Sequence, residues 1–139
     1  SNEKHYGRSK EFYFCGHNVK EFDIPYTCRR MVANMLPLPA PLNLYGKKPW
    51  EIKHLLDTME LWKFGDYKTY TSLKLLTHVL GIPSPKDDID GSEVYNVFYE
   101  EKNIDRIINY CEKDTIAVAQ ILLRLRGDAL LTNDEIISV

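Results

Sequence analysis

Two short apolar runs are the only segments of this 139-residue chain whose pattern is typical of β-strands. Residues 12–15 (Phe-Tyr-Phe-Cys) end at Gly16, and residues 55–58 (Leu-Leu-Asp-Thr) follow a long proline-rich connection. Both runs are too short for helices and fit buried strands. Because an isolated pair of strands is marginal in water, we expect an upstream segment or a partner chain to complete the sheet.

Apolar residues at helical spacing predict four helices around these strands, for an α/β fold with about four to five helices in all. They cover residues 23–36, 69 or 71 to 80, 92–99 and 103–126. We expect Asp23 to be the N-cap of the first helix and Thr69 or Thr71 to cap the second. The last helix has the clearest apolar stripe, which runs from Ile104 to Leu125, and it ends at Gly127.

Composition is that of a soluble globular domain, with 44% hydrophobic and 27% charged residues. The formal net charge of -2 gives no global attraction to nucleic acid, so such binding needs a local basic surface. Three cysteines without C-x-x-C spacing indicate reduced core thiols. No apolar run approaches the roughly 20 residues of a membrane span. We therefore expect a cytoplasmic protein with no membrane partner.

The distribution of polar and apolar residues along the chain predicts its domain organisation. Residues 1–10 read as a polar tail whose first two residues resemble the scar of a removed affinity tag. Residues 11–130 read as the C-terminal part of a larger domain, and residues 131–139 as a tail.

Two acidic residues near opposite ends of the chain are candidate metal ligands. Asp23 follows the first strand at a helix start, and Asp114 lies at the border of the apolar stripe of the last helix, one turn after Tyr110. A carboxylate at the edge of a buried face is costly unless it is paired or bound to metal, and hard divalent cations prefer oxygen ligands. The alternatives are a helix cap for Asp23, a surface acid beside Lys113 for Asp114, and a packing role for Tyr110.

The order of several motifs carries a family resemblance. The sequence contains Asn-x-x-x-Phe-Asp within residues 18–23 and Tyr-x-x-x-Asp within residues 110–114, with further matches at 56–58, 71–74, 80–81 and 86–88. Together they resemble the DEDDy-type, DnaQ-like 3′–5′ exonucleases. The resemblance is greatest to a bacterial group similar to the exonuclease domain of family B DNA polymerases.

This resemblance implies a ribonuclease H-like fold and two Mg²⁺ or Mn²⁺ ions that serve hydrolysis of DNA from single-stranded 3′ ends. It implies that Asp23 and Asp114 hold metal and that Tyr110 orients the attacking water. Asn18 and Phe22 match positions near the substrate terminus, where an aromatic ring can stack on a base. Lys86, in an acidic loop, is a candidate for approach to the phosphates.

One departure from the family is serious. Its first motif, Asp-x-Glu on an early strand, occurs nowhere in the 139 residues. We therefore expect an N-terminally truncated and inactive fragment that lacks the first strands and helix and self-associates through the edge they leave exposed. The alternative function is a non-catalytic module of ribonuclease H-like fold that binds nucleic acid or a partner.

Other polar residues have simpler interpretations. We expect Asp57 to be a structural hydrogen-bond acceptor at a strand end, and His17, His54 and His78 to be structural or solvated, since their scatter does not suggest zinc. The lysines and Trp50 of the 47–63 region fit equally well a nucleic-acid groove or a solvated loop.

Overall fold

The computed structural model describes residues 12–83 and 88–138. Within those ranges the chain forms two strands and five α-helices, with three short 3₁₀ helices between and after them. In chain order they are β1 (Phe14–Gly16), α1 (Asp23–Ala33), η1 (Ala40–Leu42), η2 (Pro49–Glu51), β2 (Leu55–Asp57), α2 (Thr58–Lys63), α3 (Leu73–Val79), α4 (Val94–Tyr99), α5 (Ile104–Arg126) and η3 (Asn133–Glu135). The predicted mixed α/β class is confirmed. Helix α2 was not predicted.

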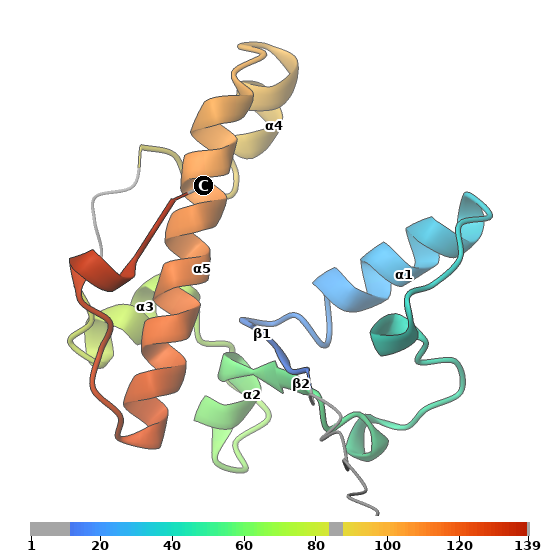
Figure 1. The fold of residues 1–139 in the computed structure, drawn as a ribbon, viewed down its shortest axis with the longest axis horizontal. Coiled ribbons are helices and arrows are strands. Elements are labelled where there is room, and N and C mark those ends of the chain that lie inside the picture. Colours follow the sequence, from blue (N-terminus) through green and yellow to red (C-terminus); the bar gives the residue numbers. More distant parts are fainter. Residues whose placement is uncertain (1–11, 84–87, 139) are drawn as a thin grey trace, which may run out of the picture.

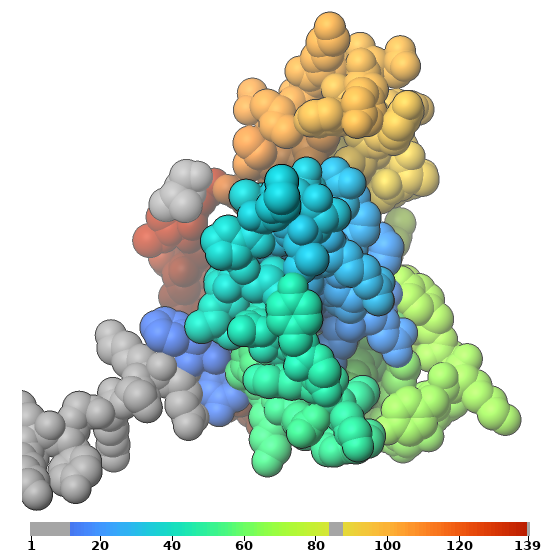
Figure 2. Space-filling model, turned by 90° about the vertical axis from the view of Figure 1, so that its right-hand side faces the viewer, coloured from blue at the N-terminus to red at the C-terminus, as the bar shows by residue number. Residues whose placement is uncertain are grey.

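Strands β1 and β2 form a parallel pair in which Phe14 lies opposite Leu55 and Gly16 opposite Asp57. Helices α1 and α5 stand on opposite sides of this pair (Figure 1). In the view turned by 90°, α1 and the connection that follows it form the front surface (Figure 2). A parallel connection needs a long crossover, and residues 17–54 supply it. Among the described residues β1 pairs only with β2, so the expectation of a small sheet holds for these ranges.

The hydrophobic core lies on the α5 side of the strands. Leu76 of α3 and Ile121 of α5 are fully buried and cluster with Ile82, while Trp62 of α2 packs against them. The chain after α5 is fastened to the same helix, because the Gln120 side chain hydrogen-bonds both backbone groups of Leu131 at 2.8 and 2.9 Å. The C-terminal half of α5 is therefore its packed half.

The N-terminal half of α5 differs from the sequence expectation. The apolar stripe was predicted to face inward along the whole helix, but Ile104 is 50% exposed and Ile108 47% exposed. Over this half the short α4 packs on the helix (Figure 1), and it buries little more than Val97. Apolar spacing marks a face that can be buried, but burial also requires a neighbouring element.

Helix ends also correct two expectations. Asp23 is the first residue of α1 and not its N-cap, since the chain already turns through residues 18–22, where the Phe22 amide bonds the Asn18 carbonyl at 3.1 Å. Helix α3 is capped by Ser72, whose hydroxyl accepts from the Leu75 amide at 3.2 Å, and not by either threonine. The predicted end of α5 is confirmed, because Gly127 has the left-handed φ of 76° that favours glycine.

Two further expectations from composition can be compared with the structure. Cys15 and Cys111 are exposed, so the assignment of all three cysteines to the core is wrong, although all three are free thiols. No described helix combines the length and the apolar character needed to cross a membrane.

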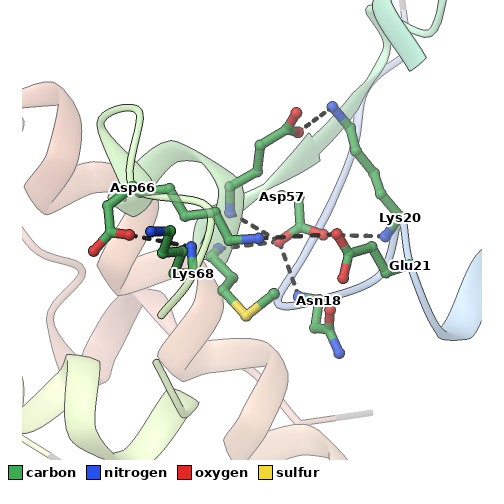
Figure 3. A network of polar contacts seen from close by, with 9 residues as sticks. Asn18, Lys20, Glu21, Asp57, Asp66 and Lys68 are labelled. Carbon is green, nitrogen blue, oxygen red and sulfur yellow. Dashed lines mark hydrogen bonds and ion pairs between the residues drawn. The ribbon is translucent and has the colours of Figure 1, made fainter. Parts of the chain in front are cut away.

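The buried Asp57 carboxylate ties the end of β2 to the turn after β1 (Figure 3). It accepts hydrogen bonds from the backbone amides of Asn18 at 2.9 Å and Lys20 at 3.0 Å. It also caps α2 through the amides of Met59 at 3.0 Å and Glu60 at 3.4 Å. The predicted structural role of Asp57 is confirmed.

We expect Asp57→Ala to lower the free energy of unfolding by about 3 kcal/mol or more. Hydrogen bonds to a charged acceptor contribute about 1.5–3 kcal/mol each, and buried amides left without a partner add a penalty. Urea denaturation followed by circular dichroism measures this loss.

The matched control is Asp66→Ala. The Asp66 carboxylate also bonds a backbone amide, that of Lys68 at 3.1 Å, and the Thr69 hydroxyl at 2.9 Å, but in an exposed turn. This variant should lose about 1 kcal/mol or less. Equal losses in the two variants would contradict the anchoring role of Asp57.

Candidate functional site

The turn between β1 and α1 brings the Val19 side chain against the backbone of Gly16. A Cβ atom on Gly16 would lie 2.0 Å from Cγ1 of Val19, so only glycine fits there without displacing the turn. Asn18 has a left-handed φ of 61°, a conformation that asparagine tolerates better than most residues. Asn18 follows the end of β1, and its amide is hydrogen-bonded to Asp57 at the end of β2, so both strands fix its position.

His17 fixes the same turn from the other side. Its ring bonds the Thr58 hydroxyl through Nδ1 at 2.9 Å and the Thr71 carbonyl through Nε2 at 2.8 Å. Because a carbonyl oxygen only accepts, Nε2 donates this hydrogen bond. His54 similarly bonds the Pro41 carbonyl at 2.7 Å. The predicted structural role of these two histidines is confirmed.

The side chain of Asn18 has spare hydrogen-bonding capacity. Its Oδ1 atom is buried and has no hydrogen-bond partner, and Figure 3 shows the side chain pointing away from Asp57. Buried polar atoms are normally paired. An unpaired acceptor at the end of a strand is therefore a place where a ligand's donor group would be stabilised.

Phe22 and Asp23 follow on the same turn, at the start of α1. Phe22 is 63% exposed and its ring stacks on that of Tyr26, with centroids 6.3 Å apart. Asp23 is exposed in the first helical turn, where a negative charge is favoured by the helix dipole. The structure thus brings together three of the predicted site residues: Asn18, Phe22 and Asp23.

Tyr110 and Asp114 lie together elsewhere, on an open cavity of about 1200 Å³ between α5, α3 and the segment around residues 88–93. The Tyr110 hydroxyl is 3.5 Å from the position that a Cβ on Gly91 would occupy. Asp114 is half-buried. Lys74 and His78, one turn apart on α3, also line the cavity.

Ion pairs hold the acidic segment at the rim of this cavity. The guanidinium of Arg106 bonds the Asp88 carboxylate at 2.6 and 3.2 Å and also pairs with Glu101. The Arg106 hydrogen bonds lower the pKa of Asp88, and hydrogen bonds from Ser92 lower the pKa of Asp90. Both carboxylates are therefore ionised at neutral pH.

These two groups of residues do not form one assembled metal site in residues 12–83 and 88–138. Asp23 does not line the cavity that Tyr110 and Asp114 share, and no three His, Cys, Asp or Glu side chains of the described residues gather to hold an ion. Partial burial of the Cys15 sulfur, and then the charge of Asp57, raise the pKa of its thiol. Lys86 lies outside the described residues.

Sequence reasoning missed Lys74 and His78 as cavity residues. Both are exposed on α3, and the packing of α3 against α5 brings them to the cavity that Asp114 also lines. Their spacing of four residues, which puts them on one helix face, was the available signal. The acidic run at 87–90 had been noticed, but not that it lies beside Tyr110.

The fold defines the class of protein, and comparison with known proteins defines the family. The strand pair with helices on both sides defines a mixed α/β domain. A family model described as a predicted 3′–5′ exonuclease related to the exonuclease domain of PolB matches residues 8–133. Since this is most of the chain, the protein belongs to that family. Neither a curated protein nor a solved structure matches the chain.

We expect Arg106→Gln to raise the pKa of the Asp88 carboxyl toward the usual value of about 3.9, because the charged hydrogen bonds that favour its ionised form are lost. A lowered pKa in the folded state contributes stability above the unfolded pKa, and that stability is lost as pH falls through the folded pKa. The variant should therefore show a weaker loss of stability on acidification. Carboxyl ¹³C titration by NMR measures the pKa.

Arg124→Gln is the control on the same helix, because Arg124 has no ion pair among the described residues. An unchanged Asp88 titration in Arg106→Gln, or an equal shift in Arg124→Gln, would contradict the assigned pairing.

Proposed function

We propose that this chain is part of a 3′–5′ exonuclease that hydrolyses DNA phosphodiester bonds from single-stranded 3′ ends. The observation that carries the proposal is the family match over residues 8–133. As finer assignments we propose the DEDDy type, the bacterial group named above, a ribonuclease H-like fold for the complete domain and a cytoplasmic location.

The proposed roles follow the two groups of residues. Tyr110, on the cavity that it shares with Asp114, orients the attacking water. Asn18 and Phe22 receive the terminal nucleotide, which is supported by the unpaired Asn18 oxygen and the exposed Phe22 ring. Lys86 is proposed to approach the phosphates.

The proposed cofactors are two Mg²⁺ or Mn²⁺ ions, with Asp23 and Asp114 as carboxylate ligands. The described residues alone do not fit such a site, since they supply no cluster of ligands. Two ions need about twice as many carboxylates as these two residues provide. We propose that the missing acids belong to a segment outside these 139 residues, which pairs with the open edge of β1. Without it, the same edge and the exposed Phe12 and Tyr13 favour self-association.

A second candidate function is a non-catalytic module that binds nucleic acid or a partner. The observation that favours it is the same absence of a three-ligand cluster in the described ranges. Activity of the complete polypeptide distinguishes the two functions.

We expect the 139-residue chain alone to release little or no nucleotide from a 3′-labelled single strand in Mg²⁺ or Mn²⁺, because its ligand set is incomplete. Gel analysis of the labelled strand measures this. Vigorous Mn²⁺-dependent degradation that Asp114→Ala abolishes would contradict an incomplete site.

We expect the polypeptide translated from the complete coding sequence to shorten the same strand from its 3′ end. Loss of an outer-shell partner of a metal site lowers activity about 10- to 100-fold. Asp23→Ala and Asp114→Ala remove proposed direct ligands, so each should lower the rate by more than that. Asp105→Ala, which removes an exposed acid from the first turn of α5, is the control and should keep full activity. Inactivity of the complete polypeptide would support the non-catalytic module.

A further inference from the structure

The outward face of α1 carries a pair of aromatic rings that do not contribute to the hydrophobic core. The rings of Phe22 and Tyr26 are stacked, with an interplanar angle of 11°. They are 63% and 59% exposed, and α1 has no buried residue. Two exposed and stacked aromatic rings form a surface on which a ligand can pack.

Helix geometry separates this face from the side of α1 that faces the sheet. Ile24 and Cys28 line an apolar cavity beneath the helix, and the Cys28 thiol lies 3.6 Å from the Leu42 carbonyl that closes it. At about 100° per residue, Phe22 and Tyr26 lie about 160° around the helix from Ile24. The aromatic pair therefore faces away from the packed side.

One arginine continues the aromatic face along the helix. Arg30 comes four residues after Tyr26 and is exposed, whereas Arg29 lines the cavity beneath the helix. The Arg30 guanidinium has no ion pair within the described ranges, whereas Lys20 and Lys63 on the other side of α1 pair with Glu60 and Glu21. The acid of this face, Asp23, lies at its opposite end.

A second tyrosine pair shows that exposed stacking alone is not the signal. Tyr95 and Tyr99 of α4 are also four residues apart, with centroids 4.7 Å apart, and both are exposed. Their helix is flanked by Glu93, Glu100 and Glu101. That surface repels phosphate, while the α1 face attracts it.

We propose that the α1 face, formed by Phe22, Tyr26 and Arg30, binds single-stranded nucleic acid. Unpaired bases stack on the two rings, and the arginine contacts the phosphate that follows. This combination of aromatic platforms and a cation is what sequence-tolerant single-strand binding uses. A local positive charge is also what a chain of net charge -2 requires for such binding. The inference rests on the proposed function for its ligand, and it extends the substrate contact beyond Phe22.

The test is fluorescence anisotropy of labelled oligothymidylate with the 139-residue chain, in EDTA so that no hydrolysis occurs. Tyr26→Ala should raise Kd by about fivefold or more, the equivalent of losing one stacked base. Tyr95→Ala, the matched control on α4, should leave Kd unchanged. Oligouridylate and a blunt duplex are the other arms. Duplex should bind more weakly, because its bases are already stacked, and the two single strands together show whether the sugar matters.

Salt dependence tests the arginine. Arg30→Gln should reduce the magnitude of the slope of log K against log salt by about 0.7, the value for one lost single-strand phosphate contact. Circular dichroism confirms that the variants keep their helices.

An unchanged Kd in Tyr26→Ala, an equal effect of Tyr95→Ala, or a preference for duplex would overturn the inference. So would a Tyr26→Ala variant that changes only self-association in sedimentation, since the face would then be a protein interface. The proposed function stands or falls separately on Asp114→Ala, because binding in EDTA needs neither metal nor Asp114.

Discussion

The carboxylate of Asp57 is the contact on which the rest of the candidate site depends. This carboxylate is buried at the end of β2. It accepts hydrogen bonds from backbone amides of the β1–α1 turn and of α2. A two-stranded sheet has little stability of its own. The hydrogen bonds to the charged Asp57 carboxylate stabilise the strand pair where the chain leaves β1, in the turn that carries Asn18.

From this anchor the chain divides into two parts that carry different chemistry. The β1–α1 turn presents an unpaired amide oxygen and an exposed ring, which suit contact with a nucleotide. Helix α5 presents Tyr110 and Asp114 to a cavity bordered by ionised acids. Between the two, the edge of β1 and the N-terminal half of α5 leave apolar surface uncovered among the described residues. In the proposed exonuclease, an additional strand at this edge would bring the two parts into one site.

The sequence was sufficient wherever a local rule decided the outcome. The strand near Phe14, the end of α5 at Gly127 and the acceptor role of Asp57 were all predicted from residue type and spacing. It failed where the answer depended on tertiary neighbours. Ser72 caps α3, and neither Thr69 nor Thr71 does. Thr71 is buried, and its backbone carbonyl is held by His17. Ile104 and Ile108 are exposed because little packs on them. Lys74 joins the cavity only through the packing of α3 on α5.

The central proposal is that the carboxylates of Asp23 and Asp114 serve one metal site in the complete protein. Paramagnetic broadening by Mn²⁺ tests it most directly, because the effect reaches only nuclei near the bound ion. Titrating ¹⁵N-labelled complete polypeptide with Mn²⁺ should broaden the resonances of both residues at the same low concentration, and Asp114→Ala should protect both. Broadening of one residue without the other, or of neither, would contradict the claim.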